Sequence, residues 1–265
     1  MSSFCRQMVA PVIATALIAQ QVGSNALRDG LLLSVFPVTS VPYFMAGAAL
    51  VAFPAAGASS RLLLRFGPAR LAPALLALSA VLFIVERALL PWAKPVAVLV
   101  YGHSSVLGAI AISAFWSLLN ESFDPHSAKP LMAKVAGAAT LGGLLGGVSA
   151  ERIAAMYSQG ALLLLLGALG GVTVTGAWIV SRGVRTMAAS PSAEPPKSAW
   201  AEVRRVPLLR SLAMITTLSA GVATLFDYVL KAEAVAWLCK GEALAASSVS
   251  SMPRRISALS FCRRP

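Results

Sequence analysis

Hydrophobic residues gather along this chain into seven long blocks, which short polar or proline-containing stretches separate. A helix needs about 20 predominantly apolar residues to cross the hydrocarbon core of a bilayer, and each block is close to or above that length. The pattern therefore predicts seven membrane-spanning helices, at residues 8–27, 43–59, 71–90, 96–119, 131–150, 160–181 and 208–238.

The pattern changes after the sixth block, where serine, proline and charged residues replace the hydrophobic ones. Such a composition is typical of a flexible linker. After residue 240, serine and arginine dominate where apolar residues would have to continue. We expect a six-helix transmembrane bundle at 1–181, a cytoplasmic linker at 182–207, a seventh transmembrane helix at 208–239 and a disordered or aberrant tail at 240–265.

Composition supports an integral membrane protein. The 265 residues are 57% hydrophobic and only 12% charged, whereas soluble domains carry about 25% charged residues. The mean hydropathy is +0.77. The net charge of +12 is assigned to Lys and Arg retained on the cytoplasmic side of the membrane. Nucleic-acid binding is not expected, because no soluble segment carries a basic patch interleaved with aromatic residues.

Charge also predicts the orientation of the helices. With a cytoplasmic N-terminus, the cytoplasmic side receives three times as many Lys and Arg residues as the other side, as the positive-inside rule requires. The cytoplasmic set is Arg6, Arg61, Arg65, Arg70, Lys129, Lys134, Arg182, Arg185, Lys197, Arg204, Arg205 and Arg210, and the opposite set is Arg28, Arg87, Lys94 and Arg152.

Two motifs and the helix order resemble the major facilitator superfamily. Six helices, a long linker and a further helix follow its plan, in which two six-helix halves enclose a site near the membrane midplane. The basic loop expected at 60–70 resembles the superfamily's G-x-L-x-D-R-x-G-R-R-R loop and keeps Arg61, Arg65, Gly67 and Arg70, with Leu64 in place of the Asp. Residues 142–147 resemble its G-P-x-x-G-G antiporter motif, with Gly143 in place of Pro. An ordinary positive-inside loop and plain helix packing are the alternatives.

A narrower resemblance is to the ATP/ADP translocase-like branch, the nucleotide exchangers. Four segments match in order: residues 25–33 resemble R-D-A-L-F-L, residues 115–129 resemble F-W-S-L-x-N-x-x-F…Q-A-K, residues 137–147 resemble G-A-G-x-S-L-G-x-x-x-G, and residues 226–232 resemble L-D-Y-x-F-K-A. The resemblance implies a secondary transporter that exchanges nucleotides or another anionic solute by alternating access. It also implies about twelve helices, so the chain is expected to be incomplete and to need a C-terminal half or another subunit.

Ionisable residues inside membrane-length blocks are costly and are therefore candidates for function. Arg28 and Lys231 are expected to contact phosphate oxygens, and Asp29 and Asp227 to hold these cations when no anion is bound; structural ion pairs are the alternative. The expected gating residues are Arg61, Arg65, Arg70, Asn120, Glu121 and Lys129, and the expected helix-packing residues are Gly142, Gly143, Gly146 and Gly147.

Other chemistry finds little support in the sequence. His103 is interpreted as a hydrogen-bonded helix residue, with proton relay as the alternative. Cys5, Cys239 and Cys262 are far apart and form no metal or redox motif. We expect no catalytic site, no metal and no cofactor, and therefore no enzyme.

The function expected from the sequence is thus membrane transport of a small anionic solute, in the plasma or inner membrane and in contact with its lipid. A drug or cation-coupled antiporter is one alternative. A transport-inactive membrane fragment that acts as an interaction module is another.

The orientation leads to a first prediction. After replacement of the three cysteines, Lys94→Cys should react with a membrane-impermeant thiol reagent added outside cells. Ser190→Cys should react only after the membrane is permeabilised, because the linker follows the positive charge to the cytoplasmic side. The reverse labelling pattern would contradict the orientation.

Overall fold

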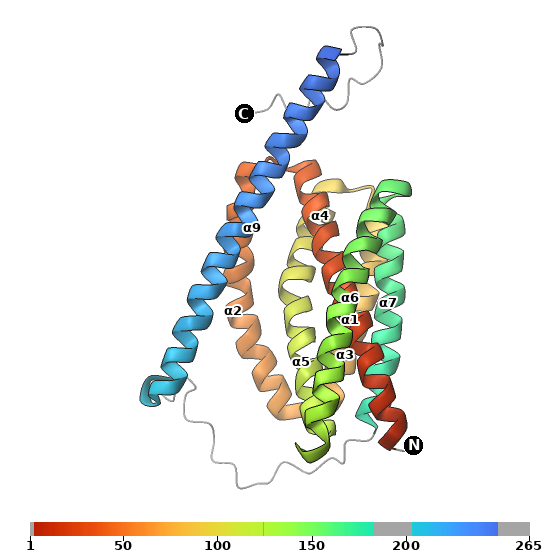
Figure 1. Cartoon of the computed structure of the whole chain (residues 1–265), viewed down its shortest axis with the longest axis vertical. Coiled ribbons are helices and arrows are strands. Elements are labelled where there is room, and N and C mark those ends of the chain that lie inside the picture. The colour runs from red at the N-terminus through yellow and green to blue at the C-terminus, as the bar shows by residue number, and fades with distance from the viewer. Residues whose placement is uncertain (1–2, 124, 183–202, 249–265) are drawn as a thin grey trace. The chain divides into compact units, whose positions relative to one another are not determined.

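The computed structural model describes residues 3–123, 125–182 and 203–248 (Figure 1). Within these ranges the chain is helical and contains no strand. Every predicted block lies in a helical element: α1 Ser3–Val35, α2 Val41–Phe66, α3 Pro68–Leu89, the run α4 Ala93–Gly102, η2 His103–Leu107 and α5 Gly108–Ser122, then α6 Pro125–Met156, α7 Gln159–Ser181 and α9 Pro207–Ser248.

Six stretches of the described chain are long and apolar enough to cross a membrane: residues 38–66, 68–89, 93–122, 130–153, 159–181 and 207–237. Helix α1, predicted as the first span, is not among them, although its 33 residues give a length of about 50 Å. Polar residues lower its hydropathy, and Gln20 and Ser24 are buried. Because these residues face other helices, α1 does not need the uniformly apolar surface of a lipid-facing helix.

The helices are longer than their apolar blocks, so three expected connections are mostly helical. Arg61 and Arg65 lie in α2 and Arg70 in α3, which corrects the expected basic loop at 60–70. The two helices are joined by Gly67 alone, at φ +73°, a conformation that glycine adopts without steric cost. Similarly, α5 and α6 cover most of the expected polar connection at 120–129, and α6 covers most of the loop expected at 151–159.

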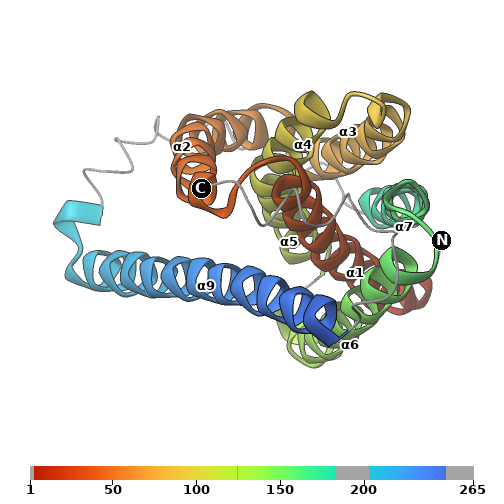
Figure 2. The same ribbon diagram turned by 90° about the horizontal axis from the view of Figure 1, so that it is seen from above.

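Contacts divide the chain into two units, residues 1–36 with 43–185 and residues 37–42 with 186–265. In the first unit, α1 packs against α6, α7 and α4, and α3 packs against α7 and α5; Figure 2 shows α1 with α4, α5, α6 and α7 close to it. Helix α2 buries only Val41. In the second unit, α9 continues to Ser248, so it includes the start of the expected tail; residues 249–265 lie outside the described chain.

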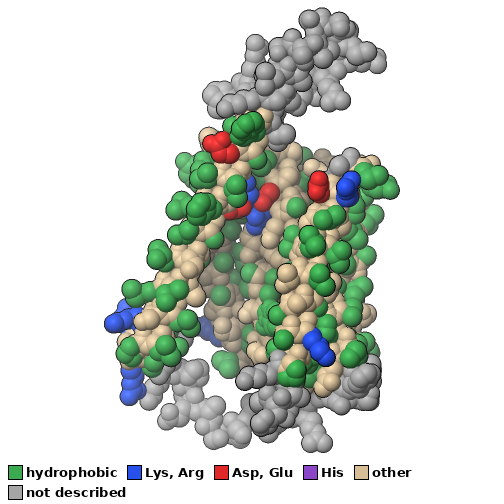
Figure 3. Space-filling view, in the orientation of Figure 1, with side chains coloured by type: hydrophobic (Ala, Val, Ile, Leu, Met, Phe, Trp, Pro, Cys, Tyr) green, Lys and Arg blue, Asp and Glu red, His purple; other side chains and the backbone are tan. Residues whose placement is uncertain are grey.

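The interior of the first unit has three layers. One hydrophobic cluster contains Ile13, Leu76, Leu118 and Val180, and a second contains Leu27, Phe83, Val100 and Leu163. On α1, α3, α7 and the α4–α5 run, buried polar residues lie between the two clusters. This polar layer consists of Gln20, Ser24, Ser79, His103, Ser104 and Thr173. On the outside, hydrophobic side chains are spread over the visible face of the bundle, and several charged side chains lie toward its ends (Figure 3).

Helix α6 approaches the backbone of α1 through two glycines. A β-carbon added to Gly142 would lie 2.8 Å from Cα of Thr15, and one added to Gly146 would lie 2.7 Å from Cα of Ala19. The Thr15 hydroxyl donates a hydrogen bond to the carbonyl oxygen of Ala138 at 3.0 Å. Gly143 and Gly147, which were also expected to pack, meet only side chains of α1 at ordinary contact distance.

The close approach gives a second prediction. Gly142→Ala should lower the free energy of unfolding by about 1–3 kcal/mol, because the added methyl group forces two backbones apart. The matched control is Gly137→Ala on the same helix, where nothing lies within 4 Å of the added carbon. Denaturant titration of the detergent-solubilised variants would measure both values. Equal stability of the two variants would contradict the contact.

Candidate functional site

The polar layer is built around a break in the helix that follows α3. Residues His103–Leu107 form a π-helical turn between α4 and α5. Such turns are rare and occur frequently at functional sites, because they change the direction of side chains and of backbone carbonyls. Here the carbonyl oxygen of Ser104 accepts a hydrogen bond from Nε2 of Gln21, on α1, at 3.1 Å. The same amide fills the space beside Gly108, where a β-carbon would lie 2.5 Å from Oε1 of Gln21.

A buried histidine and a buried glutamate meet at the start of this turn. Nδ1 of His103 lies 2.8 Å from Oε1 of Glu86, and Nε2 lies 2.8 Å from the hydroxyl oxygen of Ser79. Glu86 is 0% exposed and His103 is 5% exposed. The ring of Phe83 lies 4.5 Å from the imidazole, centroid to centroid. The imidazole therefore bridges two positions on α3, with an aromatic ring beside it.

A small cavity adjoins this group. Its volume is about 10 Å³, and its polar lining comes from Gln20, Gln21, Ser24, Ser79, His103 and Ser104. A volume of this size is close to the minimum for one water molecule. Oε1 of Gln20, Oγ of Ser104 and Oε2 of Glu86 are buried and have no hydrogen-bond partner among the described residues. The layer thus contains more hydrogen-bonding capacity than its own side chains use.

A second polar group surrounds Arg28, on α1. Nε of Arg28 donates to Oδ1 of Asp29 at 2.9 Å, and Nη1 donates to the hydroxyl of Ser105 at 3.1 Å. The guanidinium carbon lies 5.0 Å from the centre of the Tyr101 ring, a distance typical of a cation–π interaction. The side chains of Arg28 and Asp29 are 15% and 24% exposed. The π-helical turn thus contributes one residue to each polar group: His103 contacts Glu86, and Ser105, two residues later, contacts Arg28.

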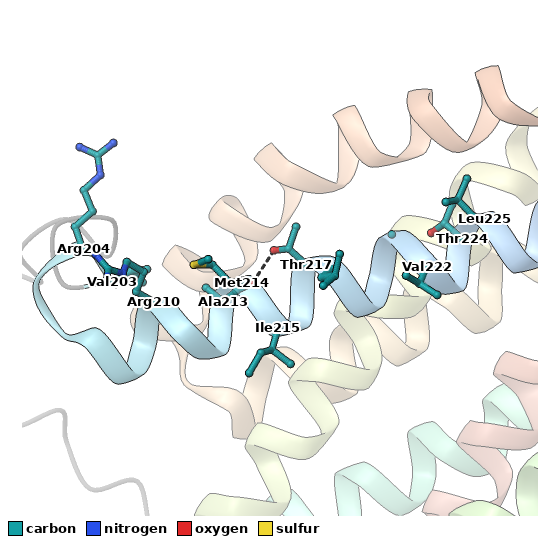
Figure 4. Close-up of a pocket in the computed structure, with 12 residues that line it drawn as sticks. Val203, Arg204, Arg210, Ala213, Met214, Ile215, Thr217, Val222, Thr224 and Leu225 are labelled. Atoms are coloured by element: carbon teal, nitrogen blue, oxygen red, sulfur yellow. Dashed lines mark hydrogen bonds between the residues drawn. The ribbon is translucent and has the colours of Figure 1, made fainter.

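The second predicted cation lies in the other unit. Nζ of Lys231 lies 2.5 Å from Oδ2 of Asp227, one turn earlier on α9. A pocket also runs along the surface of α9. Figure 4 shows Met214, Ile215 and Leu225 among its apolar lining residues, and Arg204 and Arg210 near the beginning of the helix. The structure therefore pairs Arg28 with Asp29 and Lys231 with Asp227, each within its own unit.

The expected gating residues lie at the ends of helices and do not form a described cluster. Arg61, Arg65 and Arg70 are exposed, and the Arg65 guanidinium lies 5.3 Å from the Phe66 ring. Asn120 and Glu121 are exposed in the last turn of α5. The side chain of Lys129 lies outside the described part of the chain.

Sequence reasoning missed Glu86 and Ser79. The signal was available for Glu86, because a carboxylate within an apolar block has to find a partner. Nothing in the sequence identified that partner as His103, which is separated from it by the α3–α4 connection. In the part of the chain that the structure describes, no three His, Cys, Asp or Glu residues are grouped so that they could hold a metal ion.

Comparisons with protein-family models, with curated proteins and with solved structures give no match for this chain. The site must therefore be interpreted from its own geometry. That geometry offers a cation paired with a partly buried carboxylate. Next to the same π-helical turn, it also offers a buried carboxylate in contact with an imidazole.

The Arg28 group gives a third prediction. Asp29→Asn should lower the free energy of unfolding by about 1 kcal/mol, because the partly buried guanidinium loses its counter-charge but keeps an amide oxygen as acceptor. Glu151→Gln, at an exposed position on α6, should change it by less than about 0.5 kcal/mol. Denaturant titration would measure the free energy of unfolding of both variants. Equal losses would show that the charge of Asp29 does not stabilise the protein.

Proposed function

We propose that the protein is a secondary membrane transporter of the major facilitator type, which moves a nucleotide or another anionic solute by alternating access. The observation that carries this proposal is the position of Arg28. Its side chain is only 15% exposed and belongs to a unit with several membrane-length helices. A cation that is placed at such cost is a candidate for binding a charged solute.

The chemistry around Arg28 favours an anion over a cation. Guanidinium groups bind phosphate and carboxylate oxygens with two parallel hydrogen bonds. Asp29 supplies one carboxylate oxygen at 2.9 Å, and a solute phosphate would compete for the same donors. Without solute, the charge of Arg28 is balanced by Asp29. With solute, it would be balanced by the bound anion, and Asp29 would be released.

The packing of the first unit is compatible with movement of helices. Gly142 and Gly146 give α6 a smooth face against α1, and small residues of this kind allow close helix contacts in membranes. Helices α2 and α3 are joined by Gly67 alone.

A cation-coupled antiporter is the second candidate, and the Glu86–His103 pair favours it. A buried carboxylate and imidazole in contact at 2.8 Å can hold a proton away from water. The two candidates differ in the solute that is moved: an anion that requires Arg28, or a drug or cation that does not.

A fourth prediction tests the proposal in proteoliposomes. The purified full chain, in vesicles loaded with ATP, should take up labelled ADP or labelled inorganic phosphate. Arg28→Gln should lower the rate of this uptake at least about tenfold, since a hydrogen bond to a charged group contributes about 1.5–3 kcal/mol.

Two variants serve as controls. Arg152→Gln removes an exposed charge from α6 and should leave uptake unchanged. Arg28→Lys keeps the charge without the two-pronged geometry and should retain part of the uptake. Uptake by Arg28→Gln at the wild-type rate would remove Arg28 from the solute site. Absence of uptake of either anion by the wild type would contradict transport of these solutes by the chain.

A further inference from the structure

The carboxylate of Glu86 is an ionisable group fully buried in the first unit. It is 0% exposed, and it lies on α3, in a stretch apolar enough to cross a membrane. A carboxylate without a partner is costly in such surroundings, whereas contact with an imidazole allows a charge to be shared. The Glu86–His103 contact at 2.8 Å therefore places two ionisable groups side by side, away from solvent.

The hydrogen-bond geometry fits two protonation states without moving a heavy atom. In the first state, neutral His103 donates from Nδ1 to the Glu86 carboxylate and accepts at Nε2 from the Ser79 hydroxyl, and the pair has a net charge of −1. Addition of one proton gives a pair of net charge zero, in which Nε2 donates and the Ser79 hydroxyl accepts. A serine hydroxyl can rotate to serve either role.

We propose that Glu86 and His103, with Ser79, form a proton-binding site that couples proton movement to anion binding at Arg28. The proposal rests on the transport function proposed above. The π-helical turn links the two sites, because His103 begins it and the Arg28 guanidinium donates to Ser105 on it at 3.1 Å. A bound anion compensates the charge of Arg28, and the neutral, protonated pair is then favoured over the pair of charge −1.

The groups around the pair are mainly neutral. Helix α1 presents Gln20, Gln21 and Ser24, and η2 presents Ser104, to the same small cavity. Arg87 follows Glu86 on α3, but its guanidinium lies beside α7, where a β-carbon on Gly160 would be 2.8 Å from Nε. The other ionisable groups described on the elements packed against the pair are Arg28, Asp29, Arg70, Lys94, Tyr101 and Glu121, of which Arg28 contacts η2 directly.

By linkage, a proton that favours anion binding must be bound more readily when the anion is present. Anion uptake should therefore be stimulated by a proton gradient directed into the vesicle. The cavity of about 10 Å³ beside Ser79 and His103 has room for one water molecule, which could carry the proton to and from the imidazole.

The fifth prediction is read directly at the histidine. The chain contains two histidines, so in a His126→Gln background ¹⁵N-histidine reports on His103 alone. Its two nitrogen signals should change with pH in the detergent-solubilised protein. Glu86→Gln should abolish this change, because a protonated imidazole would then be buried without a counter-charge. Glu151→Gln is the matched control and should leave the change intact.

Three outcomes would overturn the proton site: nitrogen signals that stay constant over the whole pH range in which the protein is folded, signals that titrate identically in Glu86→Gln, and a proton-gradient stimulation of uptake that Glu86→Gln retains. Should Glu86→Gln fail to fold, the double variant with His103→Gln removes the pair as a whole. Proton uptake by its vesicles, followed with a pH-sensitive dye, should then be lost; retained uptake would count against the site.

The proton site and the transport function can fail separately. A wild type that moves neither anion but whose His103 titration depends on Glu86 keeps the proton site and loses the proposed function and the coupling. Anion uptake that depends on Arg28, combined with a His103 that never titrates, keeps the function and overturns the proton site. Arg28→Gln should lose uptake yet retain the His103 titration, which separates a coupling role from a general loss of structure.

Discussion

The burial of one carboxylate constrains the interior of the first unit more than any other single group. Glu86 is inaccessible to solvent, and a charge in such a place has to be shared or neutralised. The imidazole of His103 meets it at 2.8 Å, and Ser79 fixes the other ring nitrogen. Because the ring spans two positions of α3, the register of α3 against the α4–α5 run is set by this contact.

The same constraint accounts for the unusual composition of α1. A helix that faces polar groups in the middle of a bundle has to supply hydrogen bonds there, and Gln21 does so by donating to the carbonyl oxygen of Ser104. Where the glycines of α6 approach its backbone, α1 carries the small residues Thr15 and Ala19. Its polar and small residues lower its hydropathy, although it is the helix most surrounded by others.

The sequence predicted the helices well because membrane length and apolar composition are local properties. Their ends were predicted less well, since polar residues such as Arg65 and Asn120 continue a helix as readily as they leave it. The pair Asp227–Lys231 could be anticipated from its spacing of four residues. The adjacent pair Arg28–Asp29 could be anticipated only from the cost of an ionisable group without a partner in an apolar block. The pairing of Glu86 with His103 and the π-helical turn could not, because both depend on how separate helices are placed side by side.

Hydrogen bonds and apolar contacts differ in how they respond to movement. An apolar side chain can exchange one neighbour for another at little cost, whereas a hydrogen bond weakens steeply away from its preferred geometry. The bonds of His103, Gln21 and Arg28 therefore hold α1, α3 and the α4–α5 run together, and close backbone contact holds α6 to α1. Helix α2 buries only Val41, and the ring of Phe44 on this helix lies beside Phe36 and Tyr101. Among the described helices of this unit, α2 thus buries the fewest residues, and the Tyr101 ring lies between Phe44 and the Arg28 guanidinium as a contact of both.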